Sequence, residues 1–138
     1  MDRAVIEQKL ESLRRCLARM TEKCPVDAET LARDVDAQDI VTLNLTRSVQ
    51  LSVDMAAHLI VSRDIPAPNT MGQAFDSLAS VGLISPALAS RMKKAVGFRN
   101  IAIHNYDAID WGIVHSICQR HLSDFRDFAA CIVKLEQL

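Results

Sequence analysis

The sequence contains no hydrophobic run long enough to cross a lipid bilayer, although 49% of its 138 residues are hydrophobic. It also lacks the apolar core of a signal peptide, because residues 1–20 alternate charged and apolar positions. These absences argue against a membrane protein and predict a cytosolic one. The length fits one domain over residues 1–138, which can bury about two-thirds of its unfolded surface.

Residue groups that bind metals are also absent. The four cysteines contain no C-x-x-C pair, which argues against a zinc site or a redox dithiol: they are Cys16, Cys24, Cys118 and Cys131. Asp54 and His58, four positions apart, are too few ligands for a closed metal site, so we expect an ordinary helical pair or an interface contact. The sequence therefore predicts reduced thiols in a cytosolic core, with no metal and no other cofactor.

The chain has no excess of positive charge. Its 16 basic and 17 acidic residues give a formal net charge of −1, whereas proteins that hold nucleic acid by bulk electrostatics are strongly basic. Any RNA binding must therefore be local. The candidate basic residues form two groups, Arg91, Lys93, Lys94 and Arg99 in one and Arg14, Arg15 and Arg19 in the other. Taken alone, both groups are more typical of solvated helix faces.

Helical periodicity is present along nearly the whole sequence. Apolar residues from Ile6 to Met20 are spaced 4, 3, 4 and 3 positions apart, as on one helix face. Further helices are predicted from Asp27 through Val35, from Asp36 or Asp39 to about Arg63, and from Asn69 or Thr70 to Gly82. Two more are predicted from Ser85–Pro86 into the segment 99–106, and from Trp111 onward. Since no alternating strand is found, the sequence predicts an all-α antiparallel bundle of about five helices.

The last predicted helix carries two rows of apolar positions at seven-residue spacing. One row is Trp111, Cys118, Phe125 and Ile132, and the other is Val114, His121, Phe128 and Leu135. This pattern predicts a single helix that Trp111 anchors at its start. It also predicts that His121 is a core histidine with its hydrogen bonds satisfied.

The octapeptide from Arg99 to Tyr106 combines reactive side chains near the end of a predicted helix. These residue types suit cleavage of a phosphodiester without a metal. His104 can take a proton from an RNA 2′-hydroxyl or give one to the leaving 5′-oxygen, since imidazole titrates at about pH 6.5. Arg99 can bind the scissile phosphate, and Asn100 can orient the phosphate or the imidazole. Attack by the 2′-hydroxyl restricts the substrate to RNA and produces a 2′,3′-cyclic phosphate.

A helical wheel separates these residues. Arg99 and Tyr106 fall on the apolar face, whereas His104 lies about 140° from Arg99, on the side of Asn100. A charge on an apolar face is costly, so either an acid such as Asp36 or Asp39 pairs with Arg99, or this face lines a cleft between subunits. Three arrangements can still bring the two side chains together. The long stem of Arg99 can swing across the helix, the helix can loosen before Asp107, or a second subunit can supply the histidine. One subunit offers one such histidine, so an acid and base pair requires a dimer.

Several segments together resemble the HepT-like branch of bacterial ribonuclease toxins in the HEPN superfamily. They are the octapeptide, the stretch from Gln38 to Ile60 with Asn44-Leu45 and Val49-Gln50-Leu51, and the stretch from Thr70 to Ile84. The resemblance implies an all-α homodimer that cleaves mRNA or tRNA, with Arg99 and His104 as nuclease residues and Asn100 in support. It also implies a type VII-like toxin–antitoxin system, in which a nucleotidyltransferase antitoxin of the MntA type adds AMP to Tyr106.

That modification has a physical rationale on the predicted wheel. AMP on Tyr106 would bring a phosphodiester charge that pairs with Arg99 and occupies the position of the substrate phosphate. Two other functions stay open at this point. The chain can be a helical dimer that binds a nucleotidyltransferase without cutting RNA, or a nucleotide-binding module in which Arg99 holds a phosphate.

Overall fold

The computed structural model of the chain describes residues 2–136, in which every regular element is a helix. In chain order they are α1 (Arg3–Lys23), α2 (Ala28–Arg33), α3 (Val35–Ser62), α4 (Met71–Ser80), α5 (Pro86–His104), the 3₁₀ turn η1 (Tyr106–Ala108), α6 (Trp111–Arg120) and α7 (Leu122–Glu136). The predicted all-α bundle is confirmed. The described part has seven α-helices instead of about five, partly because the last predicted helix is divided in two.

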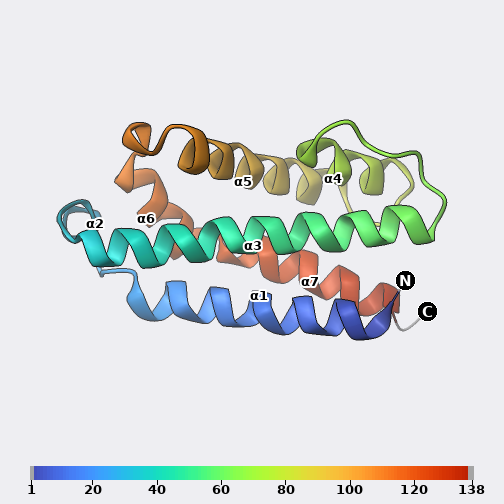
Figure 1. Cartoon of the computed structure of the whole chain (residues 1–138), viewed down its shortest axis with the longest axis horizontal. Helices are drawn as coiled ribbons and strands as arrows, with labels where there is room; N and C mark the ends of the chain where they lie inside the picture. Colours follow the sequence, from blue (N-terminus) through green and yellow to red (C-terminus); the bar gives the residue numbers. More distant parts are fainter. Residues whose placement is uncertain (1, 137–138) are drawn as a thin grey trace.

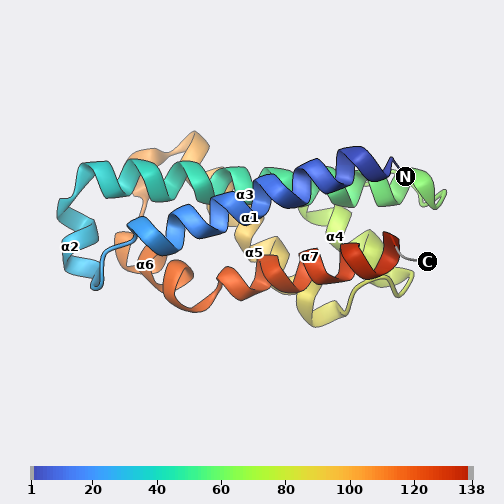
Figure 2. The ribbon, with the colours of Figure 1, turned by 90° about the horizontal axis from the view of Figure 1, so that it is seen from below.

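The 28-residue α3 is the central helix of the bundle. Figure 1 shows α1 along one side of α3 and α5 along the other, and Figure 2 shows α1 and α3 on one side of the bundle with α7 on the other. The core between the helices contains fully buried Phe75 and Phe128, whose rings meet edge to face with centroids 5.3 Å apart. Burying such a side chain contributes about 1.5–3 kcal/mol. No helix within residues 2–136 is long and apolar enough to cross a membrane.

Short polar side chains define the helix starts. The predicted caps Asp27, Thr70 and Ser85 each accept a backbone N–H three residues ahead, and Pro86 follows in the first turn of α5. The prediction that Asp36 or Asp39 begins the long helix was wrong, because the Asp34 carboxylate accepts from the Ala37 N–H at 3.0 Å and caps α3. Because α3 begins earlier than predicted, Asp39 is available for another contact.

The last predicted helix breaks at His121. Seven of the eight predicted seam residues are buried or half-buried in the core as expected, among them Phe125, Phe128 and Ile132. His121, however, lies between α6 and α7 with a side chain that is 53% exposed, so the prediction of a core histidine was wrong. Its Nδ1 lies 3.6 Å from the Asp124 carboxylate at the start of α7. The imidazole thus lies at the surface of the bundle, beside this buried acid.

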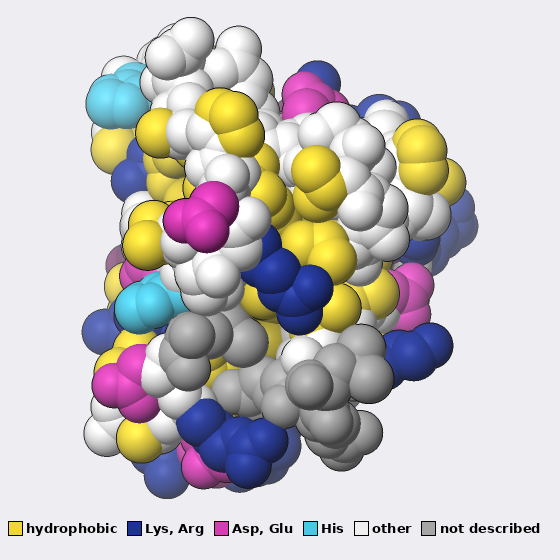
Figure 3. All heavy atoms as spheres, turned by 90° about the vertical axis from the view of Figure 1, so that its right-hand side faces the viewer, with side chains coloured by type: hydrophobic (Ala, Val, Ile, Leu, Met, Phe, Trp, Pro, Cys, Tyr) yellow, Lys and Arg dark blue, Asp and Glu magenta, His cyan; other side chains and the backbone are white. Residues whose placement is uncertain are grey.

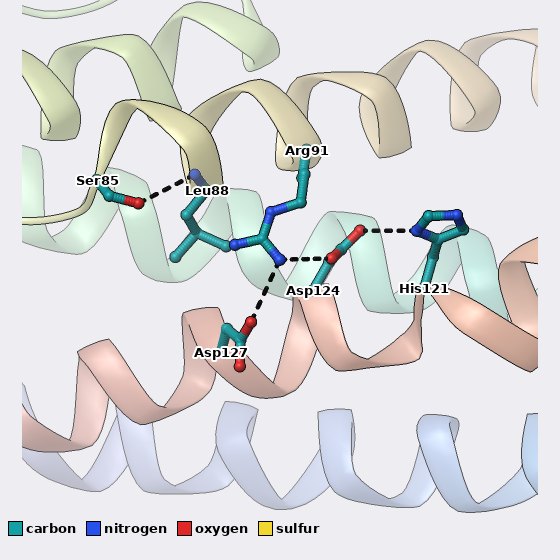
Figure 4. Close-up of polar contacts among 6 residues, drawn as sticks. All are labelled: Ser85, Leu88, Arg91, His121, Asp124 and Asp127. Carbon is teal, nitrogen blue, oxygen red and sulfur yellow. Dashed lines mark hydrogen bonds and ion pairs between the residues drawn. The ribbon is translucent and has the colours of Figure 1, made fainter.

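An ion-pair cluster ties α5 to α7 (Figure 4). Arg91 donates to Asp124 at 2.9 Å and to Asp127 at 3.3 Å, and it approaches both from above the first turns of α7. Lys93 similarly meets Asp76 of α4 at 2.8 Å. Two of the four candidate basic residues near the octapeptide are thus neutralised by acids of neighbouring helices, which leaves them a structural role.

Candidate functional site

Arg99 is a half-buried cation without an acidic partner in the described part of the chain. Its Nη2 donates to the Gln50 side-chain oxygen of α3 at 3.4 Å, and its Nη1 donates to the Asn100 oxygen at 3.3 Å. Its Nε is buried and has no hydrogen-bond partner within residues 2–136. Neither Asp36 nor Asp39 forms the ion pair considered from the sequence. The positive charge is therefore held by amide oxygens alone and stays available to an anion.

A line of polar contacts behind Arg99 connects three helices. The Gln50 amide nitrogen donates to Asp54 at 2.9 Å, and Asp54 in turn accepts from Lys9 of α1 at 3.3 Å. Because Asp54 takes the amide N–H of Gln50, the amide oxygen is turned toward Arg99. Asp54 thus bonds Gln50 and Lys9 rather than His58, the helical partner considered from the sequence. Lys9, Asp54 and Gln50 together orient the guanidinium.

His104 is the last residue of α5 and is exposed. Its side chain takes part in no hydrogen bond or ion pair with residues 2–136. The next residue, Asn105, leaves the helix with φ −150° and ψ 65°. The loosening before Asp107, one of the three arrangements considered from the sequence, is therefore present. Asn100, one turn earlier and also exposed, shares the side of His104. Within one chain, His104 and Arg99 therefore project from different sides of α5.

Tyr106 lies outside α5, in the turn η1. Its hydroxyl donates to Asp39 of α3 at 3.2 Å, and its ring meets Trp111 edge to face at 6.0 Å. The side chain remains 42% exposed. Burial, together with the hydrogen bond to Asp39, raises the pKa of the Tyr106 hydroxyl, so the group is neutral at physiological pH. A reagent can reach this hydroxyl, and Asp39 is placed to accept its proton.

Arg99 and Tyr106 contact the same side of α3, but at different positions along the helix axis. Gln50 and Asp39 are eleven positions apart, which places them on one face of α3 about three turns and about 16 Å from each other. The prediction that Arg99 and Tyr106 share one face of a single helix was wrong, because α5 ends at His104 and Tyr106 lies in η1. The two side chains instead contact one face of α3. Between the two contacts, this face of α3 carries the exposed Leu43 and the half-buried Thr46.

Metal ligands do not gather at this site. Residues 2–136 contain no group of three or more His, Cys, Asp or Glu side chains that could hold a metal ion. The four cysteines are free thiols, two of them buried. The functional groups of the predicted site residues are a guanidinium, an imidazole, an amide and a phenol.

The family of the chain follows from comparison with known proteins. A family model described as ribonuclease HepT-like matches residues 6–132, which include the whole octapeptide. The chain belongs to the ribonuclease HepT-like family. Among its relatives, a protein of Shewanella oneidensis named mRNA nuclease HepT is 34% identical over 124 residues, which cover 90% of this chain and 92% of that protein.

Two further relatives of the HepT-like chain cover most of its length. A protein of Aphanizomenon flos-aquae named tRNA nuclease HepT is 26% identical over 106 residues, covering 77% of this chain and 72% of that protein. A solved structure of the tri-AMPylated Shewanella oneidensis HEPN toxin in complex with MNT antitoxin superposes with a TM-score of 0.90 at 33% identity, covering 97% of this chain and 99% of that one. The HepT-like fold thus extends over nearly the whole molecule.

The structure of the HepT-like chain also adds Gln50 to the site, a residue whose role the sequence pattern did not reveal. Gln50 and Asp54 are separated by four positions on α3, a spacing at which glutamine and aspartate side chains pair. That spacing was the local signal available. The contact from Gln50 to Arg99 joins residues 49 positions apart and depends on how α3 packs against α5.

Proposed function

We propose that this HepT-like chain is a metal-independent endoribonuclease toxin that cleaves RNA, either mRNA or tRNA. The observation that carries the proposal is Arg99, a half-buried guanidinium held by two amide oxygens and by no acid of residues 2–136. A cation placed in this way binds a phosphate without first releasing a carboxylate. The relatives named as RNA nucleases support the same activity. We further propose that residues 1–138 act as one domain in the cytoplasm, where these RNAs are found.

The catalytic roles follow from the chemistry of the side chains. Arg99 binds the scissile phosphate and stabilises the negative charge that grows on its oxygens. His104 takes the proton of the 2′-hydroxyl, whose oxygen attacks phosphorus, or gives a proton to the 5′-oxygen as the P–O bond breaks. Asn100 accepts from Arg99 at 3.3 Å, so it is placed to orient the guanidinium and the phosphate that it binds. The products are a 2′,3′-cyclic phosphate and a 5′-hydroxyl.

We propose a homodimer that completes this site. Within one chain His104 and Arg99 project from different sides of α5, so His104 of the partner subunit is the group we place at the phosphate bound by Arg99. Two exposed apolar residues, Ile101 and Ile103, are 45% and 50% accessible immediately before His104. Apolar side chains at this position favour burial against a second copy, and a two-fold axis builds two equivalent sites.

The proposed regulator is a nucleotidyltransferase antitoxin of the MntA type that adds AMP to Tyr106. The side chain is 42% exposed, and Asp39 at 3.2 Å is placed to accept the hydroxyl proton as the oxygen attacks the α-phosphate of ATP and pyrophosphate leaves. The product carries a phosphodiester on the surface that joins Tyr106 to Arg99. The tri-AMPylated toxin from Shewanella oneidensis supports this proposal.

The activity is tested on the purified chain, freed from its antitoxin. We expect cleavage of RNA that persists in EDTA and products that end in a 2′,3′-cyclic phosphate, identified by mass spectrometry of the fragments. Sedimentation is expected to give a particle of two 15.3-kDa chains. A chain that leaves RNA intact in both EDTA and Mg²⁺ would contradict the nuclease proposal, and a monomer at assay concentrations would contradict the shared site.

The contact behind Arg99 gives a separate prediction. Gln50→Leu removes the amide oxygen that orients the guanidinium, and we expect kcat for RNA cleavage to fall about tenfold, the lower range for losing a hydrogen bond to a charged group. The long 3.4 Å contact favours that lower range. Gln119→Leu, an exposed position on α6, is the matched control and should keep wild-type activity. Equal kcat values for the two variants would remove Gln50 from the site.

A further inference from the structure

A groove whose charged lining residues are all basic lies between α1 and α3. It has a volume of about 640 Å³ and is lined by three arginines, Arg15 and Arg19 of α1 and Arg47 of α3. None of its lining residues is acidic. By contrast, the far end of the bundle carries basic, acidic and apolar side chains intermixed (Figure 3). On a chain of net charge −1, the groove is a local basic surface.

The arginines of the groove are only weakly neutralised. Arg47 is exposed and forms no ion pair with residues 2–136. Arg15 shares Glu11 with Arg14, which binds that carboxylate more closely, at 2.7 and 2.9 Å, and lowers the pKa of Glu11 to about 2. Arg19 meets an exposed glutamate at 3.6 Å. Exposed pairs of this kind contribute little, so all three cations can turn to a stronger anion.

The groove continues into the catalytic site. Leu43, Arg47 and Gln50 are spaced four and three positions apart on α3, so they share one face of the helix, and all three line the groove. Gln50 is also the residue whose side-chain oxygen accepts from Arg99. Arg47 therefore stands one helical turn from the residue that holds the proposed phosphate-binding guanidinium. The exposed Leu43 adds apolar surface beside it.

We propose that this groove binds the RNA strand next to the cleaved bond, with Arg47 holding the phosphate that follows the one at Arg99 and with Arg15 and Arg19 holding phosphates further along. The inference rests on the proposed nuclease function and extends it to the path of the substrate. Three unpaired or loosely paired guanidinium groups match the repeating charge of a nucleic-acid backbone. Phosphate contacts of this kind position the strand and carry no base-sequence information.

The test measures binding separately from cleavage. In the His104→Ala background, the homodimer is titrated with a short fluorescein-labelled single-stranded RNA of mixed sequence at several salt concentrations. The logarithm of the association constant falls linearly with the logarithm of the salt concentration, and each phosphate contact that is lost makes this slope less steep by about 0.7. We therefore expect Arg47→Gln to bind RNA more weakly, with a slope that is less steep by about 0.7. The double variant Arg15→Gln/Arg47→Gln should have a slope that is less steep by about 1.4. Arg63→Gln, an equal loss of charge at the exposed far end of α3, should leave the slope unchanged.

Each other outcome overturns the inference in a distinct way. An unchanged slope and affinity in Arg47→Gln would show that RNA does not use the groove. Dissociation of the Arg47→Gln dimer in sedimentation would assign the groove to contact between protein chains. The wild-type chain is assayed for cleavage in parallel. A wild type that fails to cut RNA contradicts the nuclease proposal, whereas one that cuts RNA while Arg47→Gln binds normally contradicts the groove alone.

Discussion

His104→Ala is expected to lower RNA cleavage about a hundredfold to ten-thousandfold, the usual range for losing a general acid or base. The proton of the 2′-hydroxyl then has no acceptor at the phosphate bound by Arg99. The exposed imidazole makes no hydrogen bond with residues 2–136, so the melting temperature should remain that of the wild type. Rates on labelled RNA in EDTA measure the loss. His121→Ala, which removes another exposed imidazole, is the control and should cut RNA normally.

Mixed dimers decide which subunit supplies the histidine. Arg99→Ala and His104→Ala chains are each expected to be nearly inactive alone. If each site takes Arg99 from one subunit and His104 from the other, a mixed dimer contains one intact site, and an equal mixture should recover about a quarter of wild-type activity. Recovery is absent if both groups act within one subunit. Cleavage that persists in His104→Ala itself would remove this residue from the mechanism.

Tyr106→Phe is expected to abolish protection by the antitoxin while leaving the nuclease intact. The variant keeps the ring against Trp111 but lacks the oxygen that receives AMP. Cells that express the variant together with the antitoxin should stop growing, whereas the wild-type pair should grow. Mass spectrometry of the co-purified chains should find AMP adducts on the Tyr106 peptide of the wild type and none on the variant.

The control for Tyr106→Phe is its activity without antitoxin. The lost hydrogen bond to Asp39 is exposed and contributes about 1 kcal/mol at most, so the unmodified variant should fold and cut RNA like the wild type. Full rescue of growth by the antitoxin would mean that modification of Tyr106 is not the switch. Loss of cleavage in the isolated variant would instead place the hydroxyl in the reaction.

The sequence predicts the local parts of this molecule well. Ser85 and Pro86 mark the start of α5, and the position of Arg99 on its inner side follows from helical spacing. The start of α3 is harder, because three aspartates within six positions can each cap a helix. Asp34 is the residue that caps α3, and this follows only from the end of α2 at Arg33. The break at His121 interrupts no apolar pattern. The exposed histidine lies beside a buried acid that is paired with Arg91 of another helix, and no local pattern reveals that contact.

The site itself combines local and distant information. Arg99, Asn100 and His104 are visible as one motif, and their separation on the helix is also predictable. The contacts that complete the site, from Gln50 to Arg99 and from Asp39 to Tyr106, join positions 49 and 67 residues apart. They depend on the register between α3 and α5, which no periodicity within one helix determines.

The separation of two contacts along α3 bears on how the proposed modification would act. The phosphate of a first AMP on Tyr106 would be bonded directly to the phenolic oxygen, which contacts α3 about 16 Å along the helix axis from the level of Gln50 and Arg99. We therefore expect each further AMP unit to bring more negative charge toward Arg99 along this face of α3. Under the proposed regulation, the residual nuclease activity is expected to fall step by step as the number of AMP units on Tyr106 rises.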